Sequence, residues 1–381
     1  MKKHALLLGL IINAGILFAQ VNGDDNKVQL QGQAVSWLHY NPDNPYPLYV
    51  GARYIPQFNY EICLPNKALI DFEASANMVG DVGLQITDSA DWNGKVSPYR
   101  VWARYSTEQF ELRAGLQKIN FGSATLLRPL MWFDQVDPRD PLQLTDGVWG
   151  VLTRYYFLNN ANLWAWVLYG NDNTKGWELI PSNKHVPEFG GRLQLPFSIG
   201  EAAVSYHHRK ANSRHLNYVP QYEKIPENRI GLDARFDKVV GFWFEGTWVH
   251  MAKDIGVFTN QQSFNLGIDY TFNVGNGIGV IAEHLLSSYD KTAFDFNNVI
   301  NMTALSLNYA VGMFDNLTGI VFYNWNDKQL YNFINWTKQY DAIALNIMAY
   351  WNPDDYNMPI QANAENLFGG KGIQLMLVYN F

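Results

Sequence analysis

Arginine is the residue type that gives this 381-residue sequence its clearest binding chemistry. A guanidinium group stays charged and can bind a carboxylate or a phosphate through two parallel hydrogen bonds. Nine arginines occupy the polar positions of segments in which polar and apolar residues alternate: Arg53, Arg100, Arg104, Arg113, Arg154, Arg192, Arg209, Arg229 and Arg235. Acidic residues hold equivalent positions: Asp71, Glu73, Glu245 and Asp269. This set predicts a surface that contacts charged solutes and prefers anions.

A structural role for the same arginines has to be weighed beside the binding role. Arginines on neighbouring strands can pair with acids and stiffen a wall, and Arg113 and Arg235 are candidates for such pairing. Glu111 and Asp233 are nearby acids, but nine arginines outnumber the acids within reach. Both roles stay open for any single arginine.

Catalytic chemistry has little support in the sequence. There is no GxSxG motif, no zinc-ligand spacing and no phosphate-binding glycine loop. His207 and His208 are adjacent, and in a strand they would point to opposite faces and could not easily share a metal ion. We therefore expect no enzyme, no metal and no cofactor. A net charge of −7 also argues against a nucleic-acid partner.

Alternation of polar and apolar residues is the dominant pattern of the chain. In SFNLGIDYTF, apolar residues from Phe264 to Phe272 are separated by Asn265, Gly267, Asp269 and Thr271. Such a period of two is typical of strands with one apolar face. No run of about 18 apolar residues follows residue 20, which argues against a transmembrane helix.

The connecting segments predict how the strands are arranged. Short and long connections alternate along the chain, as they do in barrels of the outer membrane. We expect a long loop at 327–337 and a short turn at 352–355. Counting the segments between connections gives about 18 strands if Tyr356 to Asn363 is included despite Pro359. The prediction is an all-β, antiparallel, up-and-down transmembrane barrel with its apolar face outward.

Aromatic residues support this orientation. They repeatedly end the apolar side of a strand before a short turn: Tyr105, Phe157, Phe197, Phe236, Phe272 and Phe381. A ring of aromatic side chains at a membrane interface would explain this placement. A soluble β-protein with its apolar face inward is the alternative, but it explains neither the ring nor the alternating loop lengths.

Both ends of the sequence suggest export to the outer membrane. Residues 1–19 have a basic head and a short apolar core, and we expect a signal peptide that leaves 20–381 as the barrel. An uncleaved anchor is the alternative. The last strand, GIQLMLVYNF, ends on an aromatic residue and should pair with the first strand. We expect this strand to be recognised by the barrel assembly machinery.

The stretch 119–146 is the longest and most unusual connection. Leu126, Leu127, Leu130, Met131, Trp132 and Phe133 could pack against a wall. We expect Arg128, Asp134, Asp137 and Arg139 to face a pore as a constriction loop. An external cap is the alternative.

The segment ELRAGLQKINFGSATLLRPLMWFDQVDPRDP resembles outer-membrane channels related to alginate-export porins. The resemblance rests on Gly115 to Gln117, on Phe121-Gly122 and on Val136 to Asp140, and covers under a tenth of the chain. It implies a barrel of about 18 strands, an inward-folded loop and an arginine-rich lumen for anionic polysaccharide. These channels commonly have Trp where Phe121 stands.

Two functions follow as expectations. The first is an outer-membrane channel for the diffusion or export of small hydrophilic solutes, particularly anions or acidic saccharides. The second is a structural barrel that attaches surface polysaccharide and does not conduct. The second would use aromatic residues in or near the long loops, which can stack on sugars: Trp92, Trp177, Tyr218, Tyr222, Tyr331 and Trp336.

Overall fold

The computed structural model describes residues 21–23, 26–85, 90–354 and 368–381. The strands are β1 (Val21–Gly23), β2 (Asn26–Tyr40), β3 (Leu48–Cys63), β4 (Leu69–Leu84), β5 (Ala90–Ser106), β6 (Phe110–Gln117), β7 (Val148–Tyr156), β8 (Asn162–Leu168), β9 (Glu188–Phe197), β10 (Gly200–Ala211), β11 (Ile225–Asp237), β12 (Gly241–Met251), β13 (Asn260–Phe272), β14 (Ile278–Asp290), β15 (Val299–Ala310), β16 (Asp315–Asn324), β17 (Gln329–Gln339), β18 (Ile343–Trp351) and β19 (Lys371–Asn380). Two short 3-10 helices are η1 (Pro65–Lys67) and η2 (Gly256–Thr259).

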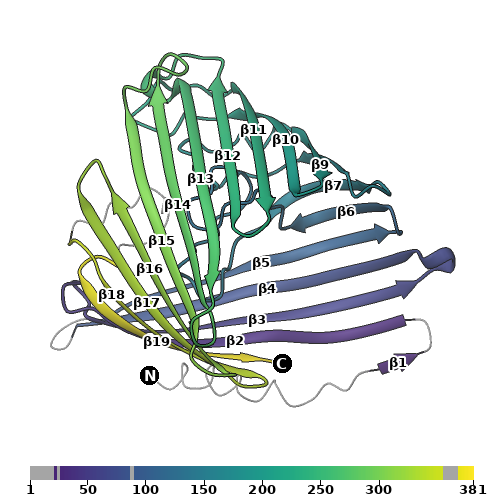
Figure 1. Ribbon diagram of the computed structural model, residues 1–381. Coiled ribbons are helices and arrows are strands. Elements are labelled where there is room, and N and C mark those ends of the chain that lie inside the picture. Colours follow the sequence, from purple (N-terminus) through teal and green to yellow (C-terminus); the bar gives the residue numbers. More distant parts are fainter. Residues whose placement is uncertain (1–20, 24–25, 86–89, 355–367) are drawn as a thin grey trace.

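Antiparallel pairing closes these strands into a barrel (Figure 1). Each strand from β2 to β19 pairs with the next, and β19 returns to pair with β2, where Leu375 lies opposite Leu38. The short β1 adds a pairing at the start of β2. The predicted all-β fold with 18 barrel strands is confirmed.

Two of the predicted connections are wrong, although the strand count is right. Residues 329–339, expected largely as a loop, form β17, and the next turn lies at 340–342 instead of 352–355. Tyr356 to Asn363, counted as a strand, lies outside the described residues. The same holds for residues 1–19, so the signal peptide stays a prediction.

The outer face of the barrel is apolar and the inner face is polar or loop-covered. Leu266 and Ile268 on the outer face of β13 are about half exposed, whereas Asn265, on the inner face of the same strand, is fully buried. Equivalent outward residues on other strands are exposed in the same way, among them Leu232, Leu307 and Leu375. Because apolar surface of this extent is stable against hydrocarbon but not against water, the predicted orientation is confirmed and the soluble alternative is wrong.

The chain end seals the barrel at the side of the short turns. The backbone N–H of Gly32 donates to the carbonyl of Phe381 (2.9 Å), and the N–H of Phe381 donates back (3.1 Å). The Phe381 ring stacks near Tyr54 and Tyr379, at 5.9 Å from each. A Cβ on residue 32 would lie 2.4 Å from this ring, so only glycine leaves room for the terminal aromatic residue.

Candidate channel interior

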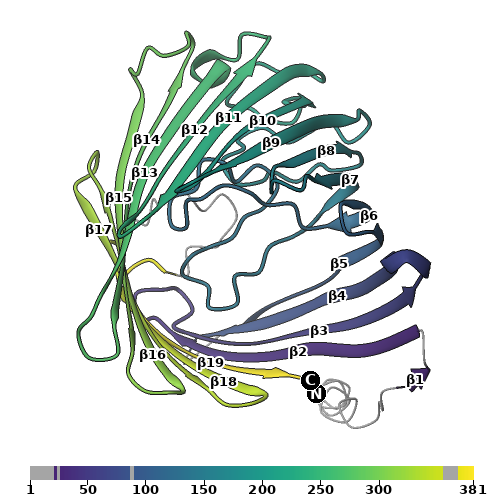
Figure 2. The same cartoon turned by 45° about the vertical axis from the view of Figure 1, so that its right-hand side comes forward.

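The segment between β6 and β7 (residues 118–147, here the inner loop) lies inside the barrel (Figure 2). One apolar cluster joins it to the wall at β7 and β8: Ile119, Phe121, Leu130, Trp132, Phe133, Val148, Leu152, Trp166 and Leu168. A second joins it to β14–β18: Leu126, Leu127, Met131, Trp177, Leu285, Met302, Ala304, Ile320, Phe322, Tyr331, Phe333, Met348 and Tyr350. These walls lie about half the barrel apart in strand order. The inward-folded loop is confirmed, and the external cap is wrong.

Glu283 on β14 holds the tip of the inner loop. Its carboxylate accepts hydrogen bonds from the backbone N–H groups of Thr125 (2.6 Å), Leu126 (3.1 Å) and Leu127 (2.6 Å). The side-chain amide of Asn265 donates to the same carboxylate (3.2 Å). Consecutive N–H groups that point at one anion form a concave binding site for it. The wall thus fixes the loop through its backbone as well as by apolar contact.

Glu245 on β12 makes a second anchor of the same kind. It accepts hydrogen bonds from the N–H groups of Ala124 (2.7 Å) and Leu130 (3.3 Å). Gly122 has φ +100°, and a Cβ there would lie 2.3 Å from Oε1 of Glu245. Glycine is therefore required where the loop crosses this carboxylate. Glu245, predicted to line the channel, is instead fully buried beneath the loop.

The charged residues of the inner loop do not face an open pore as expected. Arg128 and Asp134 are buried and form an ion pair at 2.7 Å. Arg139 is also buried, pairs with the half-buried Asp137 at 2.6 Å and places its guanidinium over the ring of Phe333. The expectation fails because the loop packs on two walls, so its charges are enclosed and must pair within it. Their role in a constriction remains a proposal.

Most of the predicted arginines have acidic partners on the wall. Seven form ion pairs: Arg104 with Asp71, Arg113 and Arg154 with Glu111, Arg192 with Asp233, Arg209 and Arg229 with Glu178 and Glu227, and Arg235 with Asp237 and Asp269. Glu73, also predicted to line the channel, is half-buried and accepts a hydrogen bond from Ser75. Most of these arginines are therefore paired within the wall, although the sequence suggested too few acids within reach of them.

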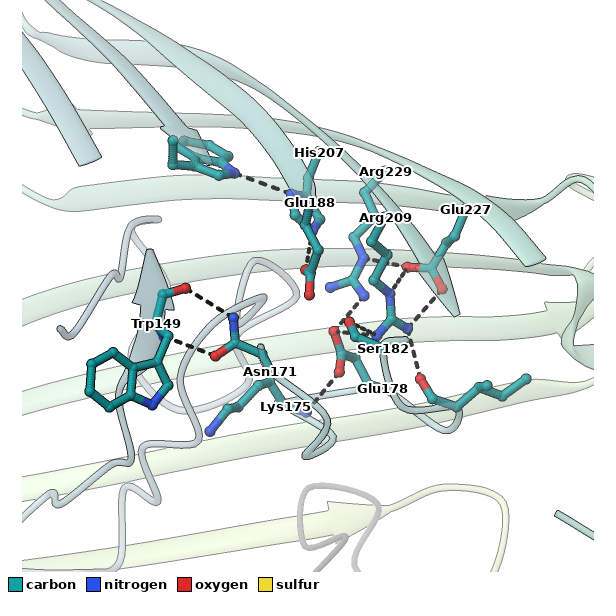
Figure 3. A network of polar contacts seen from close by, with 12 residues as sticks. Trp149, Asn171, Lys175, Glu178, Ser182, Glu188, His207, Arg209, Glu227 and Arg229 are labelled. Atoms are coloured by element: carbon teal, nitrogen blue, oxygen red, sulfur yellow. Dashed lines mark hydrogen bonds and ion pairs between the residues drawn. The ribbon is translucent and has the colours of Figure 1, made fainter. Parts of the chain in front are cut away.

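The densest of these pairings is a buried network on β10 and β11 (Figure 3). Arg209 donates to Glu227 from Nε and Nη2, at 2.7 and 2.8 Å. Arg229 donates to the same Glu227 (2.7 Å) and also to Glu178. Two guanidinium groups therefore share two carboxylates, and all four side chains are at most one-tenth exposed.

The network binds a second loop to the wall, because Glu178 belongs to the connection between β8 and β9 (residues 169–187). In the same loop, Trp177 is buried against the inner loop and its indole N–H donates to the carbonyl of Arg128 (2.9 Å). Trp177 was expected as an exposed sugar-stacking residue, and that expectation is wrong. Tyr331 is buried as well, whereas Trp92 and Tyr218 are exposed.

His207 and His208 face opposite sides of β10, as alternation predicts. His207 is fully buried inside the barrel, between Glu188 (3.1 Å) and the indole N–H of Trp166 (3.1 Å). His208 lies on the outer face beside Asn228 (2.9 Å). In the part of the chain that the structure describes, no group of three or more His, Cys, Asp or Glu residues could hold a metal ion.

A cluster of partly exposed arginines lies on the inner wall at β4–β7. Arg104, Arg113 and Arg154 share two carboxylates, those of Asp71 and Glu111. Glu73 on β4 also interacts electrostatically with Arg100 and Arg113, so the acids of this wall offset its arginines in part. The three arginine side chains keep between 16% and 28% of their surface exposed, so solvent reaches them.

Tryptophan rings contact the guanidinium groups of two of these arginines. Arg113 lies over the ring of Trp102 at 4.7 Å, and Arg154 lies over Trp164 at 3.9 Å. A guanidinium on an aromatic face is attracted by the ring and is held flat. The rings thus fix the direction of the positive groups without neutralising them.

Arg53 and Arg100 make no ion pair within the described residues. Arg53 lies 5.9 Å from the ring of Trp37. At β5, Ala76 pairs with Pro98 but Ser75 pairs with Arg100, so Tyr99 is an extra residue that turns Arg100 toward the lumen. Arg100 donates to the carbonyl of Thr145 (2.8 Å) at the end of the inner loop.

Two ionisable side chains of the loops have pKa values that are shifted from their usual ranges. Burial lowers the pKa of Lys175 in the loop between β8 and β9. Burial also raises the pKa of Asp140 in the inner loop, against two backbone N–H groups that lower it. Both groups therefore lie in places where charge is costly unless solutes or neighbours compensate it.

The inner wall at β15–β19 is uncharged and rich in amides and hydroxyls. Its inward residues include Asn308, Thr318, Asn335, Thr337, Asn346 and Gln374. They bond to one another, as Thr337 does to Asn346 (2.8 Å) and Asn308 to Thr318 (2.9 Å). The inner wall at these strands is thus neutral.

The fold, the apolar exterior and the charged interior define a transmembrane β-barrel of the outer-membrane class. None of the described helices is long and apolar enough for a membrane span. The chain is similar in structure to OccAB1 of Acinetobacter baumannii, with a TM-score of 0.58 and 9% identity over 94% of this chain and 97% of that one.

Two further porins of known structure are similar to the chain. The anion-selective porin of Comamonas acidovorans has a TM-score of 0.51 and 13% identity over 94% of this chain and all of that one. OmpF of Salmonella typhi, in a structure with daunomycin, has a TM-score of 0.52 and 12% identity over 95% of this chain and all of that one. At such identities the likeness concerns the fold. No protein-family model and no curated protein matches the sequence, so the alginate-export resemblance rests on its motif residues alone.

Some inner-wall residues could have been found from the sequence and others could not. Trp102 alternates with Arg100 and Arg104, and Glu227 alternates with Arg229, so strand spacing places them inside. Glu178 lies in an irregular loop, and no pattern predicts its contact with β10 and β11.

Proposed function

We propose that the barrel is a water-filled outer-membrane channel for small hydrophilic solutes and that it favours anions. Acidic saccharides fall within this class, because their carboxylates present the same chemistry to arginine. The inner loop would narrow the passage where it crosses from β7 and β8 to β14–β18. The likeness to three porins supports a channel, and one of the three is described as anion-selective.

The observation that carries the anion preference is the cluster of partly exposed arginines on one side of the lumen. Three arginines share two acids at β4–β7, and Arg53 and Arg100 have no ion pair among the described residues. The amide-rich wall at β15–β19 adds no negative charge. Such an arrangement produces a transverse field that attracts anions and orients polar solutes.

Reversal potential under a salt gradient tests the anion preference. In a planar bilayer with KCl at low ionic strength, we expect a potential of the sign that chloride selectivity produces. Arg53→Gln should shift this potential toward cation permeability, because it removes an unpaired lumenal charge. Arg214→Gln is the matched control, since it removes the same charge from an exposed loop residue paired with Glu223. Cation preference of the wild type that persists at low salt would contradict the proposal.

Export and assembly complete the proposal. Residues 1–19 would act as a signal peptide, and the terminal strand β19 would be recognised by the barrel assembly machinery before it pairs with β2. The exposed apolar parity of β19, from Ile373 to Tyr379, supports this role.

A further inference from the structure

The connection between β14 and β15 (residues 291–298, here the outer loop) folds over the outside of the barrel. Asp290 at its start accepts hydrogen bonds from the N–H groups of Asn297 (3.2 Å) and Asn298 (3.3 Å) and from the hydroxyl of Ser288. Ser288 and Gln262 occupy outward positions of β14 and β13, yet both are fully buried and bond to each other (3.1 Å). The outer loop therefore covers part of the outer wall.

Two phenylalanines of this loop have unusual backbone conformations. Phe294 has φ +62° and Phe296 has φ +51°, in the left-handed region that bulky residues avoid. Such a conformation is strained and persists only where the surroundings enforce it. Here the backbone strain serves to turn two aromatic side chains to one side.

That side is the lipid-facing surface of β12 and β13. Phe294 lies 5.7 Å from the ring of Trp248, and Phe296 lies 6.3 Å from the ring of Phe264. Trp248 and Phe264 lie on the outer face of the barrel. On β13 the next outward residue is Leu266, which belongs to the apolar outer face, here called the apolar belt. The two loop phenylalanines still expose 51% and 38% of their surface. They therefore extend the apolar belt at the end of the barrel that carries the long loops.

We propose that the outer loop is a lipid anchor that places Phe294 and Phe296 among the acyl chains of the outer leaflet. Lipid is the occupant because the two rings continue a surface that already faces hydrocarbon. The long-loop end faces outward in barrels of this class, which sets the leaflet. Aromatic side chains are favoured at this depth because a membrane interface accepts their large apolar surface. The proposal concerns the attachment of the barrel and does not depend on conduction.

Site-directed labelling tests the anchor in the full-length protein. In a Cys63→Ser background, which removes the single and exposed cysteine, Phe294→Cys and Phe296→Cys carry an environment-sensitive fluorophore. The labelled barrels are reconstituted into phosphatidylcholine vesicles with and without brominated acyl chains. Leu266→Cys is the lipid-facing control. Asp172→Cys is the aqueous control, since Asp172 is an exposed loop residue paired with Lys184.

We expect brominated lipid to quench labels at 294 and 296 about as strongly as the label at 266, and iodide to quench them weakly. When Asp290→Ala is added, we expect brominated lipid to quench these two labels weakly and iodide to quench them strongly, because the substitution frees the backbone of the outer loop. Heat-modifiable gel mobility identifies folded barrels, so only these are compared. Quenching by iodide without quenching by brominated lipid would overturn the anchor. So would protection from both quenchers that depends on protein density, which would indicate a second copy of the barrel on this surface.

Discussion

Deleting residues 124–143 of the inner loop should raise single-channel conductance several-fold while the barrel still folds. The deleted stretch contributes apolar side chains to both clusters that join opposite walls, so its loss opens the cross-section that it fills. The 18 strands pair without it, because their hydrogen bonds lie within the wall. Single-channel recording in a planar bilayer measures the effect, with heat-modifiable gel mobility as the check on folding.

A point variant tests whether conductance depends on how the inner loop is held in place, in addition to whether the loop is present. Glu283→Ala removes the acceptor of three backbone N–H groups at the loop tip and should give noisier currents with a smaller rise in conductance. His284→Ala is the matched control, since His284 is the next residue on β14 and is exposed on the outer face. Unchanged conductance in the deletion variant would show that the inner loop does not limit the passage.

Glu227→Gln should destabilise the barrel by about 3–5 kcal/mol, the cost of leaving buried guanidinium groups without their counter-charge. Glu227 is fully buried and accepts from both Arg209 and Arg229. The variant removes one charge but little volume, so a loss of stability reports the ion pairs and not a cavity. Unfolding by guanidinium chloride in detergent micelles measures the change.

The control for this prediction is an ion pair in solvent. Glu223→Gln breaks the exposed pair with Arg214 and should change stability by about 0–1 kcal/mol. If Glu227→Gln and Glu223→Gln had equal effects, the buried network would not be what fixes the loop between β8 and β9. We also expect that loop to become more susceptible to proteolysis in Glu227→Gln alone, because Arg209 and Arg229 hold Glu178.

The sequence predicted the barrel where one face of a strand meets lipid and the other meets water. β13 and β19 show this, since their outward residues are apolar and their inward residues include Asn265 and Gln374. Prediction failed at β17, which was expected largely as a loop. There the inward Tyr331 and Phe333 pack on the inner loop while the outward Leu330 and Ile334 meet lipid, so both faces are apolar and the alternation disappears.

The sequence also predicted only part of the channel interior. Strand parity predicts the face of the wall on which each arginine lies, because a period of two fixes the face of each side chain. Parity carries no information about which loop covers a wall residue. Glu245 was therefore expected in the open pore although the inner loop buries it, and Arg128 was expected to be exposed although Asp134 pairs with it.

Single-channel recording of the wild-type protein tests the central claim most directly. A barrel with an apolar exterior and a hydrated, arginine-bearing lumen should produce discrete current steps in a planar bilayer, with amplitudes that rise with the conductivity of the bathing salt. A preparation that is fully folded and inserted, yet passes no current at any salt concentration, would contradict the account.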